Sequence, residues 1–210
     1  RSCDDGGCSD LMKIAILGNF GDNQTAVYIM ESCRKLASDV AGIDIRQIIM
    51  DLGLEKGQAV ILDEVNSLRL NPDLILVLKG VEISKDTLLA IKTRFPNAKL
   101  VNWFFDKYLT DKTIWDEKIF FDIIKLYDKF FCSLKGVADK LKEQGLTNVE
   151  YLPEGCCLPY HKETLMNSYQ ESKYGEDISF CGNIGFLKQH PHRISILEKI
   201  IKEGYNIKIW

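Results

Sequence analysis

Short apolar runs alternate with helix-spaced apolar residues along most of this chain, and this alternation constrains its fold more than any other feature. The segments Lys13–Leu17 and Leu74–Leu78 are apolar runs of strand length, typical of strands buried on both faces. Between them, residues 22–36 place apolar side chains at helical spacing. Strands that alternate with helices in this way predict an α/β, Rossmann-like doubly wound parallel sheet with helices on both faces.

The same alternation continues to residue 152, with Gly, Pro and Asn punctuating the elements. The Ser84 hydroxyl is well placed to cap one of the helices, which ends at Arg94. Further strands are expected at Ile43–Ile48, Lys99–Phe105, Lys129–Cys132 and Val149–Leu152. Further helices are expected at Val60–Leu70, Trp115–Leu126 and Val137–Gln144.

Proline and glycine mark the end of the first domain, at Pro153, Gly155 and Pro159. A new strand–turn–helix–strand pattern starts at Asp177, and the sequence after it has room for about one such unit. We therefore interpret the second domain as incomplete, and favour a fragment over a naturally short chain. The predicted parts are a disordered leader or expression remnant (1–11), an N-terminal Rossmann-like domain (12–158), a linker (159–176) and the truncated start of a C-terminal domain (177–210).

The amino-acid composition limits the kinds of partner that this protein can bind. The chain is 46% apolar and 27% charged, as in ordinary globular proteins, and its net charge of -3 argues against a nucleic-acid partner. No uncharged apolar run reaches membrane-spanning length, and the first ten residues lack the apolar segment of a signal peptide. We therefore expect a cytoplasmic protein without a transmembrane segment, with peripheral membrane contact left open.

The seven cysteines do not form a metal-binding pattern. Cys156 and Cys157 are adjacent, which suits neither a tetrahedral zinc site nor a disulfide between them. A metal site would require both to converge with His161. We favour the alternative, in which they are linker residues in a reducing compartment, and expect no metal and no cofactor.

A glycine-bearing turn follows the first strand. Gly18 and Gly21 are three residues apart and the next glycine of a dinucleotide fingerprint is missing, so an NAD or FAD site is poorly supported. The glycines serve either a tight turn that starts a helix or a loop that approaches a ligand. Ligands of open α/β sheets bind at the carboxyl ends of the strands. We therefore take Gly18, Asn19, Phe20 and Gly21 as candidate residues of a binding cleft.

Asp106 directly follows the strand Lys99–Phe105 and so belongs to the same edge of the sheet. A carboxylate there can act as a general base toward an acceptor hydroxyl, although an N-cap or a surface ion pair is the commoner role. In the second unit, Gly182 and Asn183 offer backbone amides, while Lys188 and Arg193 offer cations for a diphosphate. The alternative for that turn is a flexible glycine loop before a solvated helix.

Two long segments resemble one known family. Residues 126–161, "LYDKFFCSLKGVADKLKEQGLTNVEYLPEGCCLPYH", are similar to the end of the N-terminal domain of spore maturation protein CgeB-like glycosyltransferases. Residues 177–210, which begin "DISFCGNIGF", are similar to the opening of that family's C-terminal domain. The segments "PDLILVLKG" and "NWFFD" also fit its middle strands. The resemblance covers most of 12–210, and its first 60 residues match only in pattern.

The resemblance implies a GT-B glycosyltransferase, which transfers a sugar from a nucleotide-sugar donor to a glycan, protein or small-molecule acceptor without a metal. It implies that Asp106 and the Gly18–Gly21 loop lie near the acceptor. It places Gly182, Asn183 and Arg193 near the donor diphosphate. The family's later donor-binding residues, including its acidic ribose-binding position, have no counterpart in this sequence, so we expect this piece alone to be inactive.

Two other functions stay open. A non-enzymatic carbohydrate- or protein-binding module derived from such an enzyme is the main alternative, and a dinucleotide-dependent oxidoreductase is the weakest. The sheet that begins at Asp177 is expected to expose an edge and apolar surface. That exposure predicts aggregation, homodimerisation or disorder of the C-terminal unit.

Overall fold

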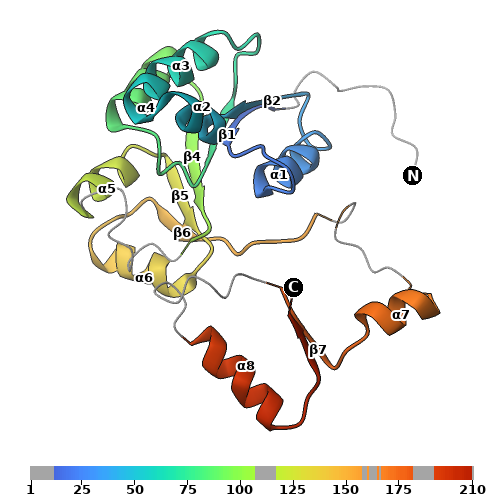
Figure 1. Cartoon of the computed structure of the whole chain (residues 1–210). Helices are drawn as coiled ribbons and strands as arrows, with labels where there is room; N and C mark the ends of the chain where they lie inside the picture. The colour runs from blue at the N-terminus through green and yellow to red at the C-terminus, as the bar shows by residue number, and fades with distance from the viewer. Residues whose placement is uncertain are drawn as a thin grey trace, which may run out of the picture. The chain divides into compact units, whose positions relative to one another are not determined.

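The chain forms two compact units, Arg1–His161 and Lys162–Trp210, which we describe separately. The computed structural model describes residues 12–106, 117–157, 160, 165, 167–181 and 192–209. The first unit is a parallel six-stranded sheet with helices on both faces (Figure 1). Its strands are β1 Lys13–Gly18, β2 Asp39–Asp44, β3 Leu74–Leu78, β4 Lys99–Phe104, β5 Lys129–Cys132 and β6 Val149–Tyr151. Its described helices are α1 Thr25–Cys33, α2 Ile45–Leu52, α3 Leu54–Asn66, α4 Lys85–Arg94, α5 Glu117–Ile124 and α6 Lys135–Glu143.

The strand order of this sheet is β2-β1-β3-β4-β5-β6, with every neighbouring pair parallel. The chain steps outward from β1 to β2, then crosses back over β1 and continues in the other direction from β3 to β6. Between β1 and β3 the direction of winding therefore reverses. The predicted α/β doubly wound parallel sheet is confirmed, and this reversal is the point at which such sheets leave a crevice for ligands.

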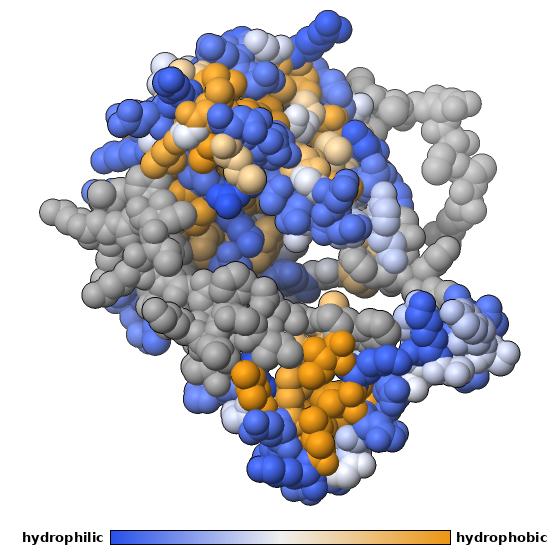
Figure 2. Space-filling view, in the orientation of Figure 1, coloured by the Kyte–Doolittle hydropathy of each residue, from blue (hydrophilic) through white to orange (hydrophobic). Residues whose placement is uncertain are grey.

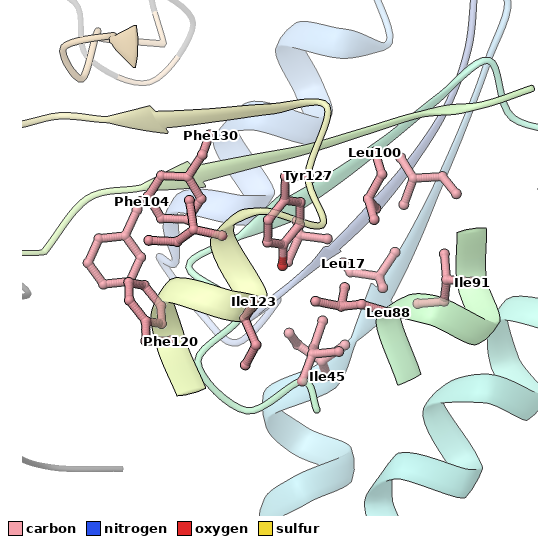
Figure 3. Close-up of a cluster of buried hydrophobic side chains, with 14 of the residues drawn as sticks. Leu17, Ile45, Leu88, Ile91, Leu100, Phe104, Phe120, Ile123, Tyr127 and Phe130 are labelled. Atoms are coloured by element: carbon pink, nitrogen blue, oxygen red, sulfur yellow. The ribbon is translucent and has the colours of Figure 1, made fainter. Parts of the chain in front are cut away.

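Side chains of the strands alternate between two unequal apolar layers. On β1, Ala15 and Leu17 face the layer built with α2 to α6, whereas Ile14 and Ile16 face the layer built with α1. The first layer is much the larger. It contains a cluster of aromatic rings around Phe130, whose centre lies 5.9–6.0 Å from those of its neighbours (Figure 3). These neighbours are Phe104, Phe120 and Tyr127.

Local sequence signals account for several element boundaries. The strand predicted at Leu74–Leu78 and the helix predicted from Ser84 to Arg94 are both present, and the Ser84 hydroxyl accepts from the backbone N–H of Thr87 at 3.1 Å. The strand predicted at Ile43–Ile48 is wrong for most of its length, because β2 begins at Asp39 and ends at Asp44 and the residues from Ile45 onward form α2. The Asp44 carboxylate caps α2 by accepting from the N–H of Gln47 at 3.0 Å.

The second unit is a small strand–helix–strand arrangement preceded by a short helix. Its described elements are α7 Ser168–Tyr174, β7 Ile178–Phe180, α8 Arg193–Lys202 and β8 Ile207–Ile209. The strands β7 and β8 pair in parallel, as the sequence predicts for the second unit. Helix α7 lies inside the segment predicted as a linker. Asn167 and Gln170 start it through a reciprocal capping box, a signal that the apolar pattern does not reveal.

Apolar side chains remain exposed on this second unit (Figure 2). Ile196 is 56% exposed and Ile201 53%, both on α8, and Ile209 on β8 is 44% exposed. No residue of β7 or β8 is fully buried, although strands of parallel sheets usually are. The homodimer predicted from this surface stays a prediction.

The buried thiol of Cys132 gives the first unit a pH-dependent stability. Burial raises the pKa of Cys132 to about 11, whereas an unfolded chain ionises its thiols near 8.5. Below about pH 8.5 both states are protonated and the full stability is present. Between about pH 8.5 and 11 only the unfolded state loses its proton, so the free energy of unfolding falls with rising pH, by at most about 3 kcal/mol.

Urea denaturation at pH 8 and pH 10.5 measures this loss. Cys132→Ala is expected to lower stability at both values but to show a smaller fall between them. The matched variant Cys156→Ala changes an exposed thiol and is expected to keep the parent's pH dependence. If the free energy of unfolding of the Cys132→Ala protein fell between these two pH values as much as that of the parent, Cys132 would not be the cause of the pH dependence.

Candidate functional site

A polar hollow of about 320 Å³ lies in the first unit, at the carboxyl ends of β1, β3 and β4. The beginnings of α1 and α2 complete its walls. This position is the reversal point of the sheet, where the connections that leave β1 and β3 run in opposite directions. Its charged lining residues are Arg46, Lys79, Glu82 and Asp106, and its uncharged polar ones are Asn19, Gln24 and Thr25.

The four charged side chains of the hollow form two ion pairs. Lys79 Nζ lies 2.9 Å from Asp106 Oδ2, and Arg46 Nη1 lies 3.0 Å from Glu82 Oε1. The side chain of Glu82 is only 13% exposed, whereas that of Asp106 is 61% exposed. The hollow therefore combines one carboxylate held in its wall with one that is open to solvent and to a ligand.

Lys79 is held in an unusual turn at the end of β3. The N–H of Gly80 donates to the carbonyl of Leu78 at 2.8 Å, closing a three-residue turn around Lys79, whose φ is 60°. A positive φ makes this the rarer and more strained form of γ-turn for a residue with a side chain. Such strain persists only where the surroundings enforce it, and here it lies in the wall of the hollow.

A buried amide supports that turn. Asn102 on β4 is 1% exposed, and its Nδ2 donates to the carbonyl of Lys79 at 3.0 Å. The N–H of Lys79 donates to the carbonyl of Trp103 at 3.0 Å. Both backbone polar groups of Lys79 are thus fixed by β4, and Asp106 follows two residues after that strand ends.

The Tyr127 hydroxyl lies near Asn102 in the apolar core, and Figure 3 shows its ring pointing into the buried cluster. Burial raises the pKa of Tyr127, and the neighbouring Asn102 side chain opposes the rise. No hydrogen bond of ordinary geometry joins the two within the described residues. We therefore attribute the shift in pKa to burial.

A second amide, on the partly buried Gln58, fixes the other end of the loop between β3 and α4. Gln58 on α3 donates from Nε2 to the carbonyl of Glu82 at 2.7 Å. Its Oε1 accepts from the N–H of Ser84 at 2.9 Å and from the Thr87 hydroxyl at 2.7 Å. The loop that carries Lys79 and Glu82 is therefore anchored at both ends, and its charges are presented by a fixed backbone.

Asn19 and Asp106 are the two predicted site residues that line the hollow, while Gly18, Phe20 and Gly21 do not. Phe20 packs into the layer of α1, and its N–H donates to Asp44 Oδ2 at 3.1 Å. Gly21 is exposed, and its N–H donates to Asn19 Oδ1 at 3.1 Å. A role for any of these residues in acceptor binding stays a prediction.

The residues predicted for a donor diphosphate belong to the second unit. Arg193 is the first residue of α8, and its guanidinium carbon lies 6.0 Å from the centre of the Phe180 ring. Gly182, Asn183 and Lys188 lie outside the described residues.

The hypothetical metal site of Cys156, Cys157 and His161 also falls partly outside them, at His161. Among the residues that the structure describes, no three His, Cys, Asp or Glu side chains are grouped to hold a metal ion. In that same part of the chain, no helix combines the length and apolarity needed to cross a membrane.

Sequence reasoning missed three charged residues of the hollow: Arg46, Lys79 and Glu82. A signal for Lys79 was present, since it directly follows the buried strand Leu74–Leu78 and precedes Gly80. Arg46 was hidden by the incorrect extension of the predicted strand through Ile48. No local sequence pattern marked Glu82 as a site residue, because its position in the wall of the hollow depends on how the loop between β3 and α4 folds.

Gly80 is required by this loop for two reasons, its φ of 69° and the space around it. A Cβ at Gly80 would lie 2.4 Å from Cγ1 of the buried Val77. Gly80→Ala is expected to destabilise the protein by about 2–4 kcal/mol, since overpacking adds to the cost of a positive φ. Chemical denaturation of the full chain measures this loss.

The matched control is Gly145→Ala. Gly145 has a φ of 94°, but nothing lies within 4 Å of the position of its Cβ. We expect it to lose only about 1–2 kcal/mol, the cost of the backbone conformation. Equal losses at the two glycines would contradict the steric part of the argument.

Comparison with known proteins does not show a family for this chain. No family model matches the chain, and no curated protein matches it. Among solved structures, one match is the "Crystal structure of TcCGT1 in complex with UDP", with 9% sequence identity and a TM-score of 0.40. The match covers 82% of this chain and 57% of that chain. At this TM-score, the fold assignment rests on the chain's own sheet topology, and the resemblance to CgeB-like proteins stays a prediction.

Proposed function

We propose that this chain is part of a GT-B glycosyltransferase of the CgeB-like type, in which the first unit binds the acceptor. The second unit would begin the half that binds the nucleotide-sugar donor. The observation that carries the proposal is the polar hollow at the reversal point of the sheet, with the Asp106 carboxylate at its open side. The second parallel strand–helix–strand unit is consistent with it.

In this proposal Asp106 acts as general base. Its carboxylate takes the proton of an acceptor hydroxyl while that oxygen forms a bond to the anomeric carbon of the donor sugar. The bond from that carbon to the nucleotide diphosphate breaks, and the diphosphate leaves with the electron pair. Lys188, Arg193 and the backbone amides of Gly182 and Asn183 are the groups we propose to stabilise that leaving group, without a metal ion.

One observation favours a second candidate, a non-enzymatic carbohydrate- or protein-binding module. Asp106 is already held in an ion pair with Lys79 at 2.9 Å, and such a pair also serves simple polar recognition of a ligand. Both candidate functions use the hollow as the binding site. Only the transferase predicts catalytic turnover. Binding of an acceptor without cleavage of any sugar donor is the result that the module predicts.

The test uses the protein expressed from its complete coding sequence. It is mixed with UDP-, GDP- and TDP-sugars and a panel of glycans, and release of nucleotide diphosphate is measured together with binding of the free diphosphates by calorimetry. The transferase proposal predicts binding of at least one nucleotide diphosphate and its release in the presence of an acceptor. A protein that binds none of them would contradict the proposal.

A further inference from the structure

The charge balance of the hollow indicates what kind of ligand it accepts. Two cations, Arg46 and Lys79, face two carboxylates, Glu82 and Asp106, so the formal charge of the four lining groups sums to zero. Each charge is already satisfied by a partner at 2.9–3.0 Å. A ligand with a net charge must therefore take a partner away from one of these ion pairs. Otherwise it lies beside a lining group that carries a charge of the same sign as its own.

The burial of the Glu82 side chain resists such a rearrangement at one end of the hollow. Glu82 is 13% exposed, and the Gln58 amide holds its carbonyl at 2.7 Å. Separating Glu82 from Arg46 would leave a largely buried carboxylate without its partner, which is costly. At the other end, Asn102 holds the carbonyl of Lys79 at 3.0 Å, so this backbone is fixed as well.

Hydroxyl groups fit this arrangement without that cost. A hydroxyl donates to a carboxylate and accepts from an ammonium or guanidinium, so it bonds to groups of either sign while both ion pairs stay intact. Asn19, Gln24 and Thr25 add uncharged donors and acceptors at the same edge. Apolar side chains, Ile45, Val81 and Phe105, supply surface for the C–H face of a sugar ring.

We propose that the hollow selects an uncharged, hydroxyl-rich acceptor, a neutral sugar or the neutral end of a glycan, over its uronic-acid or phosphorylated counterparts. The inference rests on the proposed function in that it names the acceptor class of the same site. Selection follows from the paired charges, because a negative ligand meets Glu82 and Asp106 with no unpaired cation in the charged quartet.

The test compares sugars that differ only in charge. Methyl glucoside is titrated against methyl glucuronide, and glucose against glucose 6-phosphate, while amide NMR shifts of Lys79, Glu82 and Asp106 in the full chain report binding at the hollow. We expect the neutral member of each pair to bind tighter by roughly tenfold or more. Its affinity is expected to be insensitive to salt.

A charge-changing variant tests the cause. Glu82→Gln gives the quartet a net positive charge while the Gln58 bond to the backbone stays, and we expect the glucuronide-to-glucoside affinity ratio to rise roughly tenfold. Glu64→Gln makes the same change of charge on an exposed residue of α3 that does not line the hollow. It is expected to leave the ratio unchanged.

The outcomes separate this inference from the proposed function. Tighter binding of the charged sugars, or no shift of the three amides with any sugar, overturns the inference. Glycosyl transfer onto an anionic acceptor alone would overturn it while the proposed function stands. Selective binding of neutral sugars by a protein that transfers none would support it while the transferase proposal fails.

Discussion

Phe130→Ala is expected to lower the free energy of unfolding by about 3–5 kcal/mol. Phe130 is 1% exposed, and its ring packs against Phe104, Phe120 and Tyr127 at centroid distances of 5.9–6.0 Å. Removing it deletes the central ring of this cluster and leaves a cavity that its neighbours cannot fill without moving. Because small domains are stable by only about 5–15 kcal/mol, the variant is expected to lose a large share of the total.

Guanidinium denaturation of the full chain measures the loss, provided that the slope of the transition stays the same. The matched control is Phe131→Ala, one residue along β5. Phe131 points to the opposite face of the sheet and is only partly buried, so we expect a clearly smaller loss. Equal losses at the two positions would mean that the layer of α2 to α6 does not dominate stability.

The parts of the fold that local signals specify were predictable from sequence. The apolar run Leu74–Leu78 and the cap at Ser84 fixed β3 and α4, because burial on both faces and a capping hydroxyl leave clear patterns. The segment Ile43–Ile48 was ambiguous, since its apolar residues suit both a strand and a helix. The bond from Asp44 to the N–H of Gln47 decides between them, and an apolar pattern does not contain that bond.

The candidate site was predictable only in outline. Asp106 and Asn19 follow strands of a parallel sheet, so they were expected at its carboxyl edge, and both line the hollow. The direction in which Phe20 turns could not be predicted, because it depends on the packing against α1. The turn at Lys79 depends on Asn102, more than twenty residues further along the chain, and no local pattern reveals it.

If the protein is the transferase we propose, Asp106→Asn is expected to reduce the rate of glycosyl transfer by about 10²–10⁴-fold, the usual contribution of a positioned general base. The amide keeps the size and polarity of the side chain but cannot accept the proton of the acceptor hydroxyl. The loss is therefore expected in kcat, with little change in the KM of the acceptor. Initial rates with saturating donor, in the protein expressed from its complete coding sequence, give both quantities.

Lys79→Met separates proton transfer from the ion pair. Either substitution removes the ion pair between Lys79 and Asp106, but only Asp106→Asn removes the base. If Asp106 serves only as the partner of Lys79, the two variants will show similar losses. If it takes the proton, Lys79→Met is expected to retain most of kcat and to act mainly on acceptor binding, because the carboxylate remains at the open side of the hollow. The ratio of the two kcat values therefore distinguishes a catalytic carboxylate from one that only balances charge in a binding site.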